Sequence, residues 1–168
     1  MTDKRNTLSR RNFVSGLALA VAAFTCTART AFAEVLQKLE LSDEEWRQRL
    51  TPEQFRVLRK EGTERSYTSP LNKEKRSGRY HCAGCDLPLF TSEMKFESGT
   101  GWPSFYDVLP GHIETKTDYK LFLPRTEYHC ARCGGHQGHV FKDGPQPTGL
   151  RYCNNGVALR FRPTGESA

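Results

Sequence analysis

The segments Cys82-Ala83-Gly84-Cys85 and Cys130-Ala131-Arg132-Cys133 decide how this chain folds. In each C-x-x-C pair one tight turn can present two sulfurs to the same ion, and two such pairs give the tetrahedral four-thiolate arrangement typical of zinc. Because protein sulfurs fill all four positions, none remains for water or a substrate. We therefore predict a pair of zinc knuckles that holds one structural Zn²⁺, with Cys82, Cys85, Cys130 and Cys133 as its ligands.

Two other uses of these four cysteines are open at this point. In an oxidising compartment they could form two disulfides, although a bridge inside C-x-x-C is usually strained and redox-active. A nucleic-acid-binding finger is disfavoured, because the 44-residue insert between the pairs is too long for a finger helix and no basic cluster flanks either pair. A metal site is the more economical interpretation.

The remaining cysteines are Cys26, in an apolar leader, and Cys153. A lone cysteine can be an inert core residue, whereas a reactive one needs a cation or hydrogen-bond donors that stabilise its thiolate. Such groups lie near Cys153 in the sequence. They are Arg151, Asn155, His136 and His139.

Residues 1–33 form a predicted twin-arginine signal peptide. Arg10 and Arg11 precede an apolar run at 13–24, and Ala31-Phe32-Ala33 is a small-x-small cleavage site. The apolar run is too short to span a bilayer, which takes roughly 20 residues, so we expect no stable membrane anchor after cleavage. A lipidated Cys26 is the weaker alternative, because the residues before it do not form a lipoprotein signal. We expect a periplasmic protein.

Removing this leader changes the charge of the chain. The net charge of the whole sequence is +6, but the leader carries five basic residues and one acidic residue, so residues 34–168 have a net charge of +2. A net charge of +2 is too small to indicate a nucleic-acid-binding surface. Residues 34–168 have the length of a single domain, which we expect to be monomeric.

The rest of the pattern predicts two short helices followed by strands. Ser42 with Glu45, and Thr51 with Gln54, are capping boxes, and the second helix is expected to run to about Gly62. Short strands are expected at 119–123, 139–141 and 157–161. No strand-helix-strand alternation is present. We predict a mostly β fold of bent antiparallel sheets, barrel-like or tent-like, with the helices at one end.

Five segments together resemble the B-type methionine sulfoxide reductases. They are 46–47 through 62–64, Ser98-Gly99-Thr100-Gly101-Trp102-Pro103-Ser104-Phe105, Gly138-His139-Val140-Phe141, Gly149-Leu150-Arg151-Tyr152-Cys153, and Asn155. The resemblance implies a bent antiparallel β-fold, a zinc site remote from the chemistry, and reduction of the R epimer of methionine sulfoxide, free or in oxidised proteins.

The resemblance also assigns roles to individual residues. Cys153 would be the nucleophile, and Trp102 the apolar wall that receives the sulfoxide methyl group. His136, His139 and Asn155 would hold the donor network at the sulfoxide oxygen. Arg151 would favour the thiolate.

One departure from the family concerns the second step of the reaction. Many members carry a resolving cysteine where this chain has Thr100. We therefore expect a one-cysteine enzyme, whose sulfenic acid is reduced by an external donor such as a thioredoxin-like protein. Two alternatives are a non-catalytic zinc-binding interaction module and a thiol-based peroxide sensor or scavenger.

Overall fold

The computed structural model describes residues 36–120 and 123–165, so the predicted leader, with Cys26, lies outside the described residues. The described residues all belong to one compact unit. In the described ranges, no helix has the length and apolar character that crossing a membrane requires.

The two predicted capping boxes begin the two helices. In α1 (Asp43–Arg49) the Ser42 side chain accepts from the Glu45 N–H, and in α2 (Pro52–Leu58) Thr51 and Gln54 make the same exchange. The expectation that the second helix runs to Gly62 is wrong, because α2 ends at Leu58. Glu61 has a φ of 51°, in the left-handed region that a continuing α-helix cannot use.

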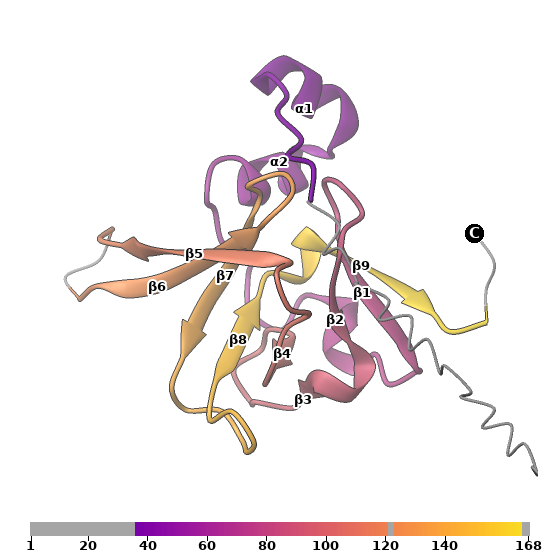
Figure 1. Cartoon of the computed structure of the whole chain (residues 1–168), viewed down its shortest axis with the longest axis vertical. Helices are drawn as coiled ribbons and strands as arrows, with labels where there is room; N and C mark the ends of the chain where they lie inside the picture. Colours follow the sequence, from indigo (N-terminus) through magenta and orange to yellow (C-terminus); the bar gives the residue numbers. More distant parts are fainter. Residues whose placement is uncertain (1–35, 121–122, 166–168) are drawn as a thin grey trace, which may run out of the picture. The chain divides into compact units, whose positions relative to one another are not determined.

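The strands form two antiparallel sheets (Figure 1). The three-stranded sheet has the order β2-β1-β9, and the six-stranded sheet has the order β3-β4-β8-β7-β6-β5. The strands are β1 (Gly78–Cys82), β2 (Pro88–Thr91), β3 (Lys95–Phe96), β4 (Ser104–Phe105), β5 (Ile113–Asp118), β6 (Arg125–Cys130), β7 (His136–Phe141), β8 (Arg151–Asn154) and β9 (Leu159–Pro163), and the short 3₁₀ turns are η1 (Pro70–Lys73), η2 (Ser92–Met94) and η3 (Gly156–Ala158). The mostly β, antiparallel prediction is confirmed, but both sheets are open rather than closed into a barrel.

Of the three expected strand segments, only 139–141 lies wholly within a strand, and residues 121–122 of the first segment lie outside the described residues. Tyr119 and Lys120 follow the end of β5 and belong to its connection to β6, where Tyr119 is exposed. The Asp118 carboxylate accepts from the Lys120 N–H, which turns the chain away from the strand path. Val157 and Ala158 lie in η3, and β9 begins only at Leu159.

Buried aromatic rings join the two sheets. Phe90 of β2 and Phe105 of β4 are stacked with centroids 4.0 Å apart, and Tyr80 of β1 meets Phe105 edge-on at 4.9 Å. Tyr128 of β6 packs edge-on against Phe90. All four side chains are buried completely, and each aromatic pair adds about 0.5–1.5 kcal/mol to the apolar burial.

The pairing of β7 with β8 leaves no room for a side chain at Gly138. Gly138 lies opposite Asn154, and His139 lies opposite Cys153. A Cβ atom at Gly138 would lie 1.9 Å from the Cys153 carbonyl oxygen, closer than any non-bonded contact allows. Glycine at this position therefore sets the separation of the two strands.

We expect Gly138→Ala to destabilise the fold by about 3 kcal/mol, because a backbone clash cannot be relieved by a rotamer change. Urea unfolding followed by circular dichroism measures this. Gly84→Ala is the matched control, since a Cβ there meets nothing closer than 3.5 Å. Equal stability of the two variants would contradict the close approach.

Candidate functional site

One cavity of about 120 Å³ gathers several of the residues singled out in the sequence. Its lining residues are Thr63, Trp102, Arg125, Gly138, His139, Phe141, Cys153, Asn154 and Asn155. Four of the predicted site residues, Trp102, His139, Cys153 and Asn155, are therefore brought together. Arg151 and His136 are not in this lining, although both contact residues that are.

Cys153 lies on β8, where it pairs with His139 of β7 and with Ser104 of β4. The thiol is only partly exposed to solvent. Burial raises the pKa of the Cys153 thiol above its ordinary value, while the Arg151 charge and hydrogen bonding from Thr100 and Arg151 act in the opposite direction. Burial outweighs these contributions, so the resting group is mainly a thiol at neutral pH.

Arg151 is held by a carboxylate. Its Nε and Nη2 donate to the two Asp143 carboxylate oxygens at 2.9 and 2.8 Å, and its guanidinium lies over the Phe141 ring at 4.4 Å. Arg151 lowers the pKa of Cys153, in the direction expected from the sequence, but Asp143 raises it. Asp143 therefore offsets part of the effect of the cation.

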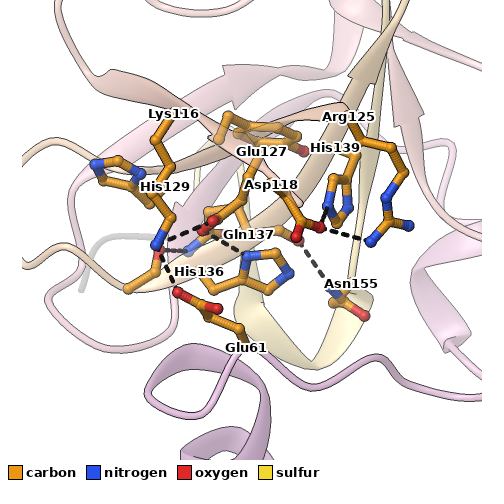
Figure 2. A network of polar contacts seen from close by, with 12 residues as sticks. Glu61, Lys116, Asp118, Arg125, Glu127, His129, His136, Gln137, His139 and Asn155 are labelled. Carbon is orange, nitrogen blue, oxygen red and sulfur yellow. Dashed lines mark hydrogen bonds and ion pairs between the residues drawn. The ribbon is translucent and has the colours of Figure 1, made fainter. Parts of the chain in front are cut away.

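The ion pair between Asp118 and Arg125 orients His139 (Figure 2). Its Nε2 lies 2.7 Å from Asp118 Oδ2, and Arg125 Nη2 lies 2.6 Å from the same oxygen. Hydrogen bonds from the Lys120 N–H and from His139 help to hold the pKa of Asp118 well below its ordinary value, so the carboxylate accepts and His139 Nε2 donates. Burial lowers the pKa of His139, against the opposing effect of Asp118.

A bulge in β7 brings His136 beside His139. The register with β6 passes from Tyr128 opposite Gly138 to His129 opposite His136, so Gln137 is an extra residue on β7. The two imidazole rings have centroids 5.6 Å apart. His136 is buried, and its Nδ1 lies 2.8 Å from the buried Glu127 carboxylate, as Figure 2 shows.

Glu64 is a site residue to which the sequence interpretation gave no role, although it stood within one of the quoted motifs. Its carbonyl accepts from Trp102 Nε1 at 3.2 Å, and its N–H donates to Asn155 Oδ1 at 2.9 Å. Its buried carboxylate accepts from the N–H groups of Gly156 and Val157 at 2.6 and 2.9 Å. Glu64 thus fixes Trp102 relative to the segment that follows Cys153.

Both polar atoms of the Asn155 side chain form hydrogen bonds with other residues of the protein. Its Nδ2 donates to the Gln137 carbonyl at 3.0 Å, while its Oδ1 accepts from Glu64. It lies between the end of β8 at Asn154 and the start of η3 at Gly156. Both of these bonds hold the end of β8 in place beneath the cavity.

The four cysteines of the two C-x-x-C motifs meet in one cluster. Their sulfurs all lie within 4.8 Å of one another, with Cys82 and Cys133 3.7 Å apart and Cys85 and Cys130 3.4 Å apart. Tetrahedral bonds of about 2.3 Å to zinc would place sulfurs about 3.8 Å apart. The cluster is therefore arranged to hold a metal ion, and the donor set fits zinc.

These observations define a class of protein: a β domain in which a cysteine, a histidine and a tryptophan share one cavity, with a separate four-cysteine metal site. The family model described as the SelR domain matches residues 50–163. The chain belongs to this family, the MsrB family of peptide methionine sulfoxide reductases.

Relatives match most of the domain. The peptide methionine sulfoxide reductase MsrB of Methanosarcina barkeri is 54% identical over 129 residues, which cover 76% of this chain and 91% of the relative. That of Pseudomonas putida is 55% identical over 130 residues, covering 76% and 97%. The chloroplastic peptide methionine sulfoxide reductase B1 of Arabidopsis thaliana is 50% identical over 130 residues, covering 77% of this chain and 64% of the relative.

We expect Asp143→Asn to lower the pKa of Cys153. The substitution removes a negative charge that raises this pKa, and it leaves the Arg151 cation without its carboxylate partner. The rate of iodoacetamide alkylation of Cys153 as a function of pH measures the shift. Asp86→Asn is the control, since Asp86 pairs with Arg162 of β9 in the other sheet. A Cys153 pKa that is unchanged or raised in Asp143→Asn would contradict the account.

We expect Glu64→Ala to destabilise the fold and to loosen Trp102 indirectly, because the backbone carbonyl that accepts from the indole remains but the carboxylate that anchors residue 64 to Gly156 and Val157 is lost. The buried N–H of Gly156 and the partly buried N–H of Val157 would lose their acceptor, and the loss at the buried group costs about 1–3 kcal/mol. Urea unfolding measures the stability, and fluorescence in a Trp46→Phe background reports on Trp102, because the chain has only two tryptophans. Glu53→Ala, an exposed change on α2, should alter neither signal. A native-like spectrum in Glu64→Ala would show that the carbonyl of residue 64 keeps the indole in place without the carboxylate anchor.

Proposed function

We propose that this chain reduces the R epimer of methionine sulfoxide in oxidised proteins to methionine, with Cys153 as the nucleophile. The observation that carries the proposal is the single cavity shared by Cys153, His139 and Trp102. Membership of the MsrB family supports the reaction itself.

The first step transfers oxygen from one sulfur to another. At rest, burial keeps Cys153 a thiol and His139 a neutral imidazole, and His139 Nε2 already donates to Asp118. His139 Nδ1 is therefore the basic nitrogen to which the Cys153 proton passes once the substrate is bound. The imidazolium then protonates the sulfoxide oxygen while the thiolate attacks the sulfur. The S–S bond formed by this attack and the S–O bond to methionine then break as the hydroxyl group passes to the Cys153 sulfur, so methionine leaves and Cys153 becomes a sulfenic acid. No net proton is consumed.

The geometry also accounts for a preference between epimers. The methyl group packs on the Trp102 indole, the oxygen faces His139, and the attack comes from Cys153. Three fixed contacts around a chiral sulfur accept only one arrangement of its substituents. Glu64 holds the indole by accepting from Nε1, so this selectivity depends on residues outside the cavity.

In the second step an external thiol donor, of thioredoxin-like type, reduces the sulfenic acid. Two thiols on the donor return Cys153 to the thiol and release water as the donor forms a disulfide. In the described ranges, every cysteine other than Cys153 belongs to the four-cysteine cluster, and Thr100 occupies the position beside the nucleophile. This supports a one-cysteine mechanism.

The metal at the cluster is proposed to be a single Zn²⁺. With Cys82, Cys85, Cys130 and Cys133 as ligands, all coordination positions are taken, so the ion stabilises the fold and offers no open position to the substrate. Metal analysis of the purified protein tests its identity, and an ion other than zinc at full occupancy would overturn the assignment.

The proposed location is the periplasm, with export by the twin-arginine route and cleavage after Ala33. The support is the leader sequence, with Arg10 and Arg11 before the apolar run. Cell fractionation of the full chain, compared with a variant in which both arginines are lysine, tests it. A processed periplasmic form in both proteins, or in neither, would contradict this route.

We expect single-turnover reduction by the pre-reduced protein to yield one equivalent of methionine from the R epimer of a blocked methionine sulfoxide and none from the S epimer. Cys153→Ser should yield none from either, a loss of at least about 10³-fold, because no other group can accept the oxygen. Chromatographic detection of the released methionine derivative measures both. Turnover of both epimers, or activity in Cys153→Ser, would contradict the proposal.

A further inference from the structure

Gln137 is a completely buried amide between the metal cluster and the catalytic cavity. It is the extra residue of the β7 bulge, and it lies between His136 and His139. Burying an amide is unfavourable unless its donors and acceptors find partners, so the contacts of this side chain show what it does there.

The two ends of the Gln137 side chain reach different parts of the molecule. Nε2 donates to Cys82 Sγ and to the Gly135 carbonyl, each at 3.4 Å. Oε1 accepts from Asn154 Nδ2 at 3.5 Å. A cluster ligand is thereby joined through one side chain to the residue that follows Cys153.

The main chain of Gln137 adds a second connection to the same segment. Its carbonyl accepts from both the N–H and the Nδ2 of Asn155, at 2.8 and 3.0 Å. Asn154 in turn donates its N–H to the Pro103 carbonyl, next to Trp102. A displacement of Gln137 would therefore shift Cys153, Asn155 and the segment that carries Trp102 together.

We propose that Gln137 couples the four-cysteine metal site to the catalytic cavity, so that the state of each affects the other. An N–H group that donates to a ligand sulfur stabilises the negative charge of a metal-bound thiolate. A residue with only a packing role would need no amide here. The inference rests on metal binding by the cluster, but it does not depend on the reduction of methionine sulfoxide.

The first arm of the test is metal retention by the zinc-loaded protein. Gln137→Leu should release Zn²⁺ to a colorimetric chelator about tenfold faster than the wild-type protein, since loss of an interaction with a metal ligand typically costs 10–100-fold. Tyr128→Phe is the matched control. It removes another buried hydrogen bond to Asn154, from the Tyr128 hydroxyl at 2.7 Å, without touching Cys82, and should release the metal at the wild-type rate.

The second arm runs in the opposite direction, because coupling between two sites is reciprocal. Alkylation of Cys153 with one equivalent of iodoacetamide, located by peptide mass, crowds the cavity and should speed zinc release from the wild-type protein at least about fivefold. In Gln137→Leu the same alkylation should leave the release rate unchanged. Gln137→Met, which keeps the chain length without the amide, repeats the comparison if the leucine variant does not fold.

Wild-type release rates in both amide-free variants, or an equal effect of alkylation with and without the amide, would overturn the coupling. Neither arm measures turnover. A failure of the proposed function would appear separately, as no methionine from the R epimer while the zinc measurements still show coupling.

Discussion

The close antiparallel contact between β7 and β8 is the constraint on which the site depends. Glycine at position 138 lets the two strands approach, and this sets His139 directly opposite Cys153. The bulge at Gln137 then turns His136 toward His139 and directs a carbonyl at Asn155. The positions of Cys153, His139 and Asn155 all follow from this one pair of strands.

The electrostatics of the cavity favour neutral groups at rest. Burial raises the pKa of the Cys153 thiol and lowers that of the His139 imidazole, so neither ionises readily before substrate arrives. The Arg151 cation works against the first effect, but Asp143 offsets it. A buried thiol that is uncharged without substrate is protected from indiscriminate oxidation, because the thiolate is the reactive form.

Much of the fold and several site residues could be predicted from local sequence signals. Both capping boxes, the mostly antiparallel β character and the meeting of two C-x-x-C pairs rest on short-range chemistry, and the structure confirms them. The roles of Glu64 and Gln137 could not be predicted. Their partners lie far away in sequence, as with the bonds from Glu64 to Asn155 and from Gln137 to Cys82. The bulge that turns His136 also leaves no sequence signal, and residues 119–120 look strand-like although they belong to a connection.

In the proposed mechanism the oxygen of the substrate passes to Cys153 and stays there until an external thiol arrives. The most direct measurement is peptide mass spectrometry after one turnover with the R epimer, in the presence of dimedone, which traps sulfenic acids. We expect one dimedone adduct, on Cys153, with the four cluster cysteines unmodified. A disulfide between Cys153 and any other cysteine, or an adduct elsewhere, would contradict it.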